Sequence, residues 1–211
     1  MKVFLDTSED LKVCQDELGA EVGQLLTPLT RFKLQNPSGK FAIDNGAYSS
    51  FNSDAFTALL KREWENRKNC VFVTAPDVVG SARRTWECFY SWYGKLASWP
   101  LAFVAQDGQG DLPIDWDRVK AVFIGGTDNF KMGNEARQII KTAQILGKWV
   151  HVGRVNGASR FKYFEELGCD SCDGSGLARY TNMRLAIRNR HLDSEQNSLF
   201  ESINAEELPC T

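Results

Sequence analysis

The chain of 211 residues is long enough to bury one sizeable core, and its 43% hydrophobic and 25% charged residues are ordinary for a folded domain. Its formal net charge of −2 argues against a general nucleic-acid coat protein, and no run approaches the roughly 18 apolar residues of a membrane span. The charged start MKVFLDTSEDLKVC lacks the apolar stretch of a signal peptide, and six cysteines without such a signal are typical of reduced thiols, so we expect a cytoplasmic protein.

The first forty residues predict a strand, a helix and a loop. Residues 1–6 alternate apolar and polar side chains, which favours a strand. Residues 9–26 predict a helix capped by Ser8. The apolar face of this helix holds Leu11, Leu18, Val22 and Leu25. The segment 35–40 combines Pro, Ser and Gly and therefore predicts a loop.

Six further apolar runs each stop at a polar or glycine residue. The runs are FAIDNG (41–46), VFVTAPD (71–77), LAFVAQDG (101–108), AVFIGG (121–126), WVHVGR (149–154) and GCDSCDG (168–174). Helical patterns alternate with these runs over residues 54–68, 81–96, 134–146, 159–167 and 182–191. Ser53 or Asp54 can cap the first of these helices. The apolar face of the helix over 54–68 holds Phe56, Leu59, Leu60 and Trp64. That of the helix over 81–96 holds Trp86, Phe89, Tyr90 and Tyr93.

The spacing of the run ends predicts the fold. Successive ends lie 20 to 33 residues apart, which leaves room for a strand, a helix and two loops. The sequence thus indicates an α/β fold with seven strands, as a trimmed or irregular (β/α)8 barrel forming one domain over residues 1–190, followed by an acidic tail over 191–211. Such barrels usually need about 250 residues. An open doubly wound sheet is the alternative, but G-x-G-x-x-G does not follow the first strand.

Three carboxylates end separate strands and are the candidate catalytic groups. Asp44, Asp77 and Asp173 should converge at one barrel mouth, because strand C-termini of a parallel barrel share one face. Converging acids repel, so at least one pKa should rise, and one carboxyl can then give a proton while another attacks as a nucleophile. This is the equipment for breaking a glycosidic bond through a covalent intermediate. Alternatively, each Asp simply caps the next helix.

Amide, glycine and arginine groups at the same strand ends are candidates for binding. Gln106 can donate and accept at the edge of a heterocycle, or else bond a neighbouring loop. Gly125 and Gly126 leave room for a flat ring, or else make a tight turn, and Gly153 ends the next strand. Arg179 opens the acid-free segment RYTNMRLAIRNR (179–190), which is either a phosphate-facing patch or a solvated basic helix face.

Neither a metal site nor a cofactor is predicted. Cys169 and Cys172 form C-x-x-C, but no second Cys or His pair follows at zinc spacing. The two histidines, His151 and His191, lie far apart in sequence, and no G-x-S-x-G motif supports a serine nucleophile.

Six fragments taken together resemble a known enzyme family. In order, FAIDNGAYSSF, TAPDVVG, FVAQDG, FIGG, HVGRVN and GCDSCDGSGLAR are similar to the tRNA-guanine transglycosylase superfamily, most closely to its short phage and bacterial branch, which is related to the 7-deazaguanine DNA transglycosylases. The resemblance runs from Phe41 to Arg179, about two thirds of the chain. It implies an irregular (β/α)8 barrel that exchanges a purine base through a covalent intermediate at C1′, in the host cytoplasm if the gene is carried by a phage.

The resemblance also implies roles for the candidate residues. Asp173 falls on the family nucleophile, and Asp44 on the acid/base that serves the departing and arriving base. Asp77 falls on the acid that holds the guanine N1 and exocyclic amine. The remaining matches are base-reading groups at Gln106 and Gly126 and a polynucleotide-proximal arginine at Arg179.

The chain departs from the family in its metal site. It lacks the three-Cys, one-His zinc site of the tRNA enzymes. It also has Asn45 where the family has Ser and Gly174 where the family often has Cys. The expected activity is therefore exchange of guanine for a 7-deazaguanine base in nucleic acid, with DNA favoured over tRNA. The alternatives are an N-glycosidase or base-exchange enzyme acting on free nucleosides or nucleotides, and a non-catalytic barrel that binds a purine. No membrane partner is expected, and a homodimer is compatible with the sequence.

Overall fold

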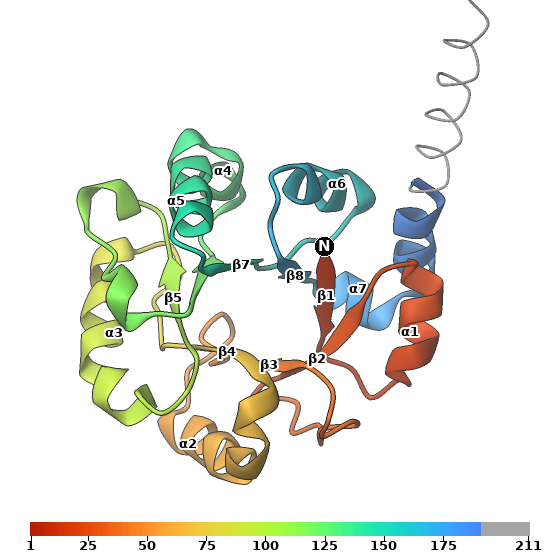
Figure 1. Ribbon diagram of the computed structural model, residues 1–211, viewed down its shortest axis with the longest axis horizontal. Helices are drawn as coiled ribbons and strands as arrows, with labels where there is room; N and C mark the ends of the chain where they lie inside the picture. The colour runs from red at the N-terminus through yellow and green to blue at the C-terminus, as the bar shows by residue number, and fades with distance from the viewer. Residues whose placement is uncertain (191–211) are drawn as a thin grey trace, which may run out of the picture.

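The computed structural model describes residues 1–190, which form a closed barrel of eight parallel strands (Figure 1). The strands are β1 Lys2–Leu5, β2 Val22–Leu26, β3 Phe41–Ile43, β4 Cys70–Thr74, β5 Leu101–Ala105, β6 Ala121–Ile124, β7 Trp149–Val152 and β8 Ser171–Asp173. Neighbours in the barrel follow chain order, and β8 closes the ring by pairing with β1, where Phe4 lies opposite Asp173. The predicted (β/α)8 barrel is confirmed.

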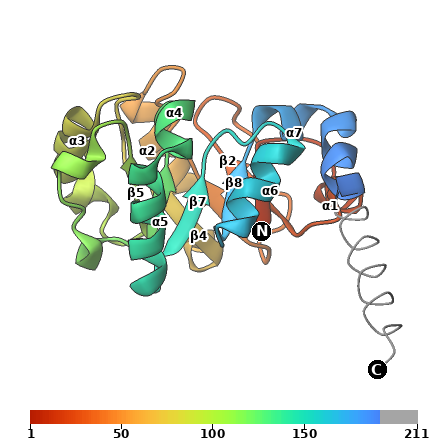
Figure 2. The ribbon, with the colours of Figure 1, turned by 90° about the horizontal axis from the view of Figure 1, so that it is seen from above.

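Helices surround the strands on the outside of the ring (Figures 1 and 2). They are α1 Leu11–Leu18, α2 Ser53–Arg62, α3 Ala82–Leu96, α4 Asp128–Met132, α5 Asn134–Ile145, α6 Ala158–Glu166 and α7 Ser175–Arg179. Short 3-10 turns cover Trp64–Asn69, Gln109–Asp111 and Trp116–Arg118, and residues 181–190 are helical. None of the helices in residues 1–190 has the length and apolar character to cross a bilayer. The predicted acidic tail lies outside the described residues.

The helix predicted over residues 9–26 is wrong in its second half. Helix α1 ends at Leu18, because Gly19 takes the left-handed conformation (φ 65°) and its N–H caps Gln15 O. The next residues form β2, which pairs with β1 and β3 and is the strand missing from the predicted seven. Its apolar residues at Val22 and Leu25 fit helical spacing as well as a buried strand, so periodicity alone could not separate the two.

Other differences concern helix ends and faces. Asp10 rather than Ser8 caps α1, and Asn52 rather than Ser53 or Asp54 caps α2 by accepting from two backbone N–H groups. The segment predicted as one helix over 54–68 is α2 followed by a 3-10 turn. Of the residues on the predicted apolar faces, Trp64 and Tyr90 are exposed, and Trp64 lies in the 3-10 turn after α2 rather than in the helix.

The barrel interior has its own core, separate from the cores between strands and helices. Phe4, Leu25, Ala42, Phe72, Ala102 and Ala121 fill it. These side chains come from alternate residues of the strands, so the next inward position along several strands reaches the C-terminal mouth. The apolar interior of the barrel thus supports a polar mouth at the C-terminal ends of the strands.

One glycine is required inside the barrel. A Cβ at Gly23 would lie 2.5 Å from Phe4 Cε1 and 2.8 Å from Lys40 O, so neither ring nor backbone leaves room for it. We expect Gly23→Ala to destabilise the fold by about 1–3 kcal/mol. Gly94→Ala is the matched control, because Gly94 lies in α3 and nothing is within 4 Å of the new methyl group. This substitution should increase the stability of the fold by about 0.4–1 kcal/mol. Urea unfolding of both variants measures whether the free energy of unfolding falls or rises. An equal change in the two variants would contradict this packing.

Candidate active site

A cavity of about 470 Å³ opens at the C-terminal end of the strands. Seven of the eight residues predicted for the site line it: Asp44, Asp77, Gln106, Gly125, Gly126, Asp173 and Arg179. Asp44 and Gln106 directly follow β3 and β5, and Asp173 ends β8. The strand geometry therefore brings together Asp44 and Asp173, which are 129 positions apart in the chain.

The surroundings of Asp44 allow its carboxyl group to change protonation state near neutral pH. Burial raises the pKa of Asp44 to about 7, and the charges of Asp173 and Asp77 add to the rise. Its Oδ2 accepts from the Gly46 N–H at 3.1 Å, and its Oδ1 from the Thr74 hydroxyl at 3.2 Å. Two hydrogen bonds thus fix the orientation of a carboxyl that changes protonation near pH 7.

Asp173 is held by one contact on each carboxylate oxygen. The backbone N–H of Arg154 donates to Oδ1 at 3.0 Å, and Nε2 of His151 lies 2.9 Å from Oδ2. The carboxylate is 14% exposed, and its position among the cavity-lining residues leaves it reachable from the cavity. This is the arrangement of a fixed, accessible nucleophile.

Asp77, Asn45 and Gln106 form one wall of the cavity. Asn45 donates to Asp77 Oδ1 at 2.9 Å, and Gln106 Nε2 donates to Asp77 Oδ2 at 2.6 Å. Gln106 Oε1 accepts from the Gly80 N–H at 3.0 Å, so the loop contact considered from the sequence is present. Burial raises the pKa of Asp77, and these two hydrogen bonds oppose the rise. A carboxylate acceptor thus stands beside an amide whose second Nε2 hydrogen can still donate to a ligand.

The three glycines act in different ways. A Cβ at Gly125 would lie 2.9 Å from Gln106 Nε2, so glycine there preserves the position of that amide. Gly126 takes the left-handed conformation (φ 69°) at a bend between β6 and α4, while still lining the cavity. Gly153 is not among the lining residues; a Cβ there would lie 2.5 Å from Phe123 Cε1, so glycine allows the ring of Phe123 to pack closely against the backbone.

Five further residues at the site were not among the eight predicted from the sequence: Asp6, Asn45, Tyr48, His151 and Arg154. Asp6 follows β1 and lines the cavity; burial raises its pKa, with the charge of Asp173 adding to the rise. The Arg154 guanidinium lies 4.3 Å from the ring centroid of Tyr48, which is 65% exposed at the cavity. Asn45 supports Asp77, and His151 supports Asp173. The strand-end rule could have found Asp6, since it directly follows β1 as Asp44 directly follows β3.

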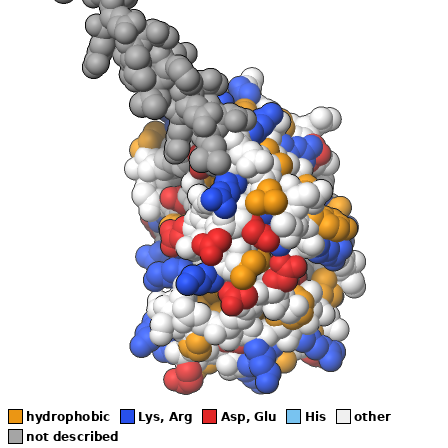
Figure 3. Space-filling view, turned by 90° about the vertical axis from the view of Figure 1, so that its right-hand side faces the viewer, with side chains coloured by type: hydrophobic (Ala, Val, Ile, Leu, Met, Phe, Trp, Pro, Cys, Tyr) orange, Lys and Arg blue, Asp and Glu red, His pale blue; other side chains and the backbone are white. Residues whose placement is uncertain are grey.

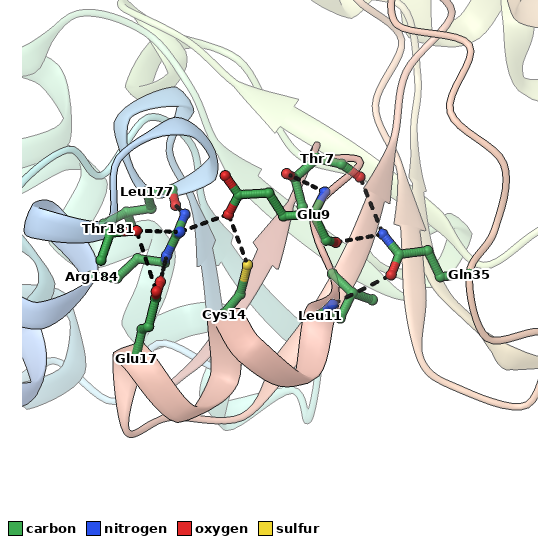
Figure 4. A network of polar contacts seen from close by, with 9 residues as sticks. All are labelled: Thr7, Glu9, Leu11, Cys14, Glu17, Gln35, Leu177, Thr181 and Arg184. Atoms are coloured by element: carbon green, nitrogen blue, oxygen red, sulfur yellow. Dashed lines mark hydrogen bonds and ion pairs between the residues drawn. The ribbon is translucent and has the colours of Figure 1, made fainter.

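The segment 179–190 is neither a continuous phosphate-facing patch nor a wholly solvated basic helix face, the two alternatives considered from the sequence, because Arg184 is buried. Arg184 is 1% exposed and forms ion pairs with Glu17 at 2.5 Å and Glu9 at 2.7 Å, while it also donates to Leu177 O (Figure 4). The loop between β1 and α1, which carries Glu9, is also held by Gln35, whose side chain donates to Glu9 O at 2.8 Å. Figure 3 shows acidic and basic side chains interspersed on the side of the barrel that carries α1. Of this segment, Arg179 lines the cavity.

Arg184 is therefore expected to act on stability. Arg184→Met should destabilise the fold by about 2–3 kcal/mol, because it removes charge-assisted hydrogen bonds from a buried guanidinium while the glutamates regain water. Arg190→Met, at an exposed position of the same helix, should change stability by no more than about 0.5 kcal/mol. Thermal and urea unfolding measure both. An Arg184 variant of unchanged stability but weaker DNA binding would restore the phosphate-patch interpretation.

Both cysteines of the C-x-x-C pair are buried. Cys172 lies on β8 and Cys169 precedes that strand, and both are buried free thiols. Burial raises the pKa of Cys169 to about 12, which disfavours the thiolate that a metal would bind. Among residues 1–190 no three His, Cys, Asp or Glu side chains are grouped to hold a metal ion.

Comparisons with known proteins identify no family for this chain. No protein-family model matches the sequence, and no curated protein matches it significantly. Among solved structures, the chain is similar to a cube-shaped, porous protein cage designed by fusing symmetric oligomeric domains, at 11% identity and TM-score 0.41, covering 97% of this chain and 78% of that one. It is also similar to the native KDPGal structure, at 9% identity and TM-score 0.38, covering 92% and 96%. These values support no inference about function.

Proposed function

We propose that this protein is a base-exchange transglycosylase, a glycosyltransferase that replaces guanine with a 7-deazaguanine derivative in nucleic acid, DNA in preference to tRNA. The observation that carries the proposal is the pairing of two carboxyl groups in one cavity. Asp44, whose pKa is raised to about 7, can carry a proton, while Asp173 is fixed by two contacts and open to substrate. Acid and nucleophile at one mouth are what glycosidic exchange requires.

The first half of the reaction uses both groups. Asp173 attacks C1′ of the nucleotide, the C1′–N9 bond breaks, and its electron pair leaves with the guanine. Asp44 delivers its proton to a ring nitrogen of the departing base, which leaves as neutral guanine. The product is a glycosyl ester on Asp173, and Asp44 is now ionised.

The second half reverses these steps with another base. Ionised Asp44 takes the N9 proton of the incoming 7-deazaguanine, the nitrogen attacks C1′, and the C1′–O bond to Asp173 breaks. Both carboxyl groups return to their starting state. A side chain with a pKa near 7 suits this double duty, since neither protonation state is costly to reach.

The cavity wall supports a guanine-like ring. Asp77 can accept from the N1–H and exocyclic amine of guanine, and the second Nε2 hydrogen of Gln106 can reach the neighbouring carbonyl. Tyr48, stacked on Arg154 and 65% exposed, offers an aromatic face to a base. A base within a duplex would have to be turned out of its stack to reach Asp173.

One observation favours a second candidate, exchange or hydrolysis of free nucleosides. Net charge is −2, and the burial of Arg184 removes one of the four arginines that could face phosphates. Nucleoside turnover would show little dependence on salt, whereas polynucleotide turnover should weaken steeply as salt rises. The non-catalytic purine-binding barrel remains the third, and it would bind 7-deazaguanine without any exchange.

An exchange assay distinguishes the three. Guanine-labelled duplex DNA, tRNA and deoxyguanosine are each incubated with the protein and an unlabelled 7-deazaguanine base, and released guanine is counted. We expect release from DNA that depends on the added base and is absent for Asp173→Ala. Asp54→Asn, which removes an exposed carboxylate from the first turn of α2, is the control and should keep wild-type activity. Release from deoxyguanosine alone would favour the second candidate, and thermal stabilisation by the base without release the third.

A further inference from the structure

A chain of hydrogen bonds runs through the barrel interior to the candidate nucleophile. Trp149 Nε1 lies 2.7 Å from Ser171 Oγ, Ser171 Oγ lies 2.8 Å from His151 Nδ1, and His151 Nε2 lies 2.9 Å from Asp173 Oδ2. All four side chains come from β7 and β8, where His151 and Ser171 are register partners. Strand alternation turns residues 149 and 151 inward together with 171 and 173.

The chemistry of the four groups orients the protons. The Trp149 indole can only donate, so Ser171 Oγ accepts from it. The single hydroxyl hydrogen of Ser171 remains available for Nδ1 of His151, which accepts it in the tautomer that the Asp173 contact favours. Nε2 of His151 consequently carries the ring hydrogen and donates to Asp173 Oδ2. In the other neutral tautomer, an unprotonated Nε2 would face a carboxylate oxygen, with two acceptors in repulsive contact.

Aromatic rings hold the imidazole in this orientation. His151 is completely buried, and the rings of Phe72 and Phe123 each lie 4.7 Å from it, centroid to centroid, with Phe4 at 6.1 Å. These neighbours exclude water and limit rotation of the ring. The Nε2–H therefore has one direction available, toward Asp173.

We propose that His151 is a positioning residue for the nucleophile Asp173, acting as a fixed Nε2–H donor. It holds Oδ2 while the Arg154 N–H holds Oδ1, so the carboxylate cannot rotate away from C1′. When the glycosyl ester forms, charge leaves the carboxylate; when the ester breaks, charge returns and the Nε2–H stabilises it. The kinetic part of this inference rests on the proposed function, whereas the proton orientation does not.

Two substitutions separate positioning from packing. His151→Phe fills the aromatic pocket without a hydrogen-bond donor. We expect it to slow glycosyl-enzyme formation by about 10–100-fold, the loss typical when a hydrogen-bond partner that orients a metal ligand is removed. Affinity for a free 7-deazaguanine base should stay within about twofold, since the Asp77 wall is untouched. His151→Gln keeps an N–H in reach and should recover most of the rate. Equal rates for wild type and His151→Phe, or no recovery by His151→Gln, would overturn the positioning role.

A spectroscopic test needs no substrate. The chain has two histidines, His151 and His191, so long-range ¹H–¹⁵N spectra give two ring patterns, and His191→Asn assigns them. We expect the Nε2–H tautomer for His151, a shifted Nε2–H signal in Asp173→Asn, and loss of the single tautomer in Ser171→Ala. An Nδ1–H tautomer, or an Nε2–H signal that ignores Asp173→Asn, would overturn the inference. If instead the tautomer is as expected but wild type exchanges no base, the proposed function fails and the hydrogen-bond chain stands.

Discussion

Asp173→Asn should reduce base exchange by at least about 10⁴-fold while leaving the fold intact. The amide has the shape of the carboxylate, and its oxygen can still accept from either the Arg154 N–H or the Nε2–H of His151, though not from both. It cannot, however, form a stable ester with C1′. Single-turnover release of guanine from labelled DNA measures the loss, with Asp54→Asn as the matched carboxylate control.

The same substitution has an electrostatic consequence. The charge of Asp173 is one cause of the raised pKa of Asp44, so Asp173→Asn should lower that pKa from about 7. Carbon-detected NMR of the side-chain carboxyl groups follows the titration. An unchanged Asp44 titration would show that the two groups do not share the cavity as described, and residual exchange close to wild type would remove Asp173 from the mechanism.

Asp44→Asn should be less active and more stable than wild type above pH 7. Activity falls by about 10²–10⁴-fold, since the departing base receives no proton. Stability rises because the folded-state pKa of Asp44 lies above its unfolded value of 3.8. Between pH 3.8 and 7 the unfolded chain gives up this proton first, so the wild-type fold loses stability as pH rises through that window. The variant avoids a loss on the order of 2–4 kcal/mol.

Urea unfolding at pH 4 and pH 8 tests this sign. Wild type and Asp44→Asn should have similar stability at pH 4 and diverge at pH 8, and Asp54→Asn should follow wild type at both. In wild type, single-turnover guanine release should fall above about pH 7 as Asp44 ionises. A variant that is destabilised at pH 8, or a release rate that is flat across pH 7, contradicts the acid role of Asp44.

The sequence allowed the barrel and most of the cavity to be predicted for one reason. Each strand of a parallel barrel delivers its last residue to the same face, so Asp44, Gln106 and Asp173 could be located from apolar runs alone. Asp77 followed from the same rule. Their roles required the fold, because protonation and orientation depend on neighbours that are distant in the chain.

What escaped prediction depends on contacts between segments. The β2 strand has apolar spacing that also fits a helix, and the left-handed Gly19 that ends α1 becomes visible only in the backbone. Arg184 looked solvated within a basic segment, yet Glu9 and Glu17, more than 160 positions earlier, bury it. His151 had no metal partner in sequence, and its partner proved to be Asp173 on the neighbouring strand.

Intact-mass analysis of the protein quenched in acid during turnover tests the central claim most directly. Wild type incubated with guanine-containing oligonucleotide should gain the mass of the oligonucleotide less one guanine, and peptide mapping should place the adduct on Asp173. Adding a 7-deazaguanine base should discharge the adduct, and Asp173→Asn should never form it. Guanine exchange without any adduct, or an adduct on another residue, would contradict nucleophilic attack by Asp173.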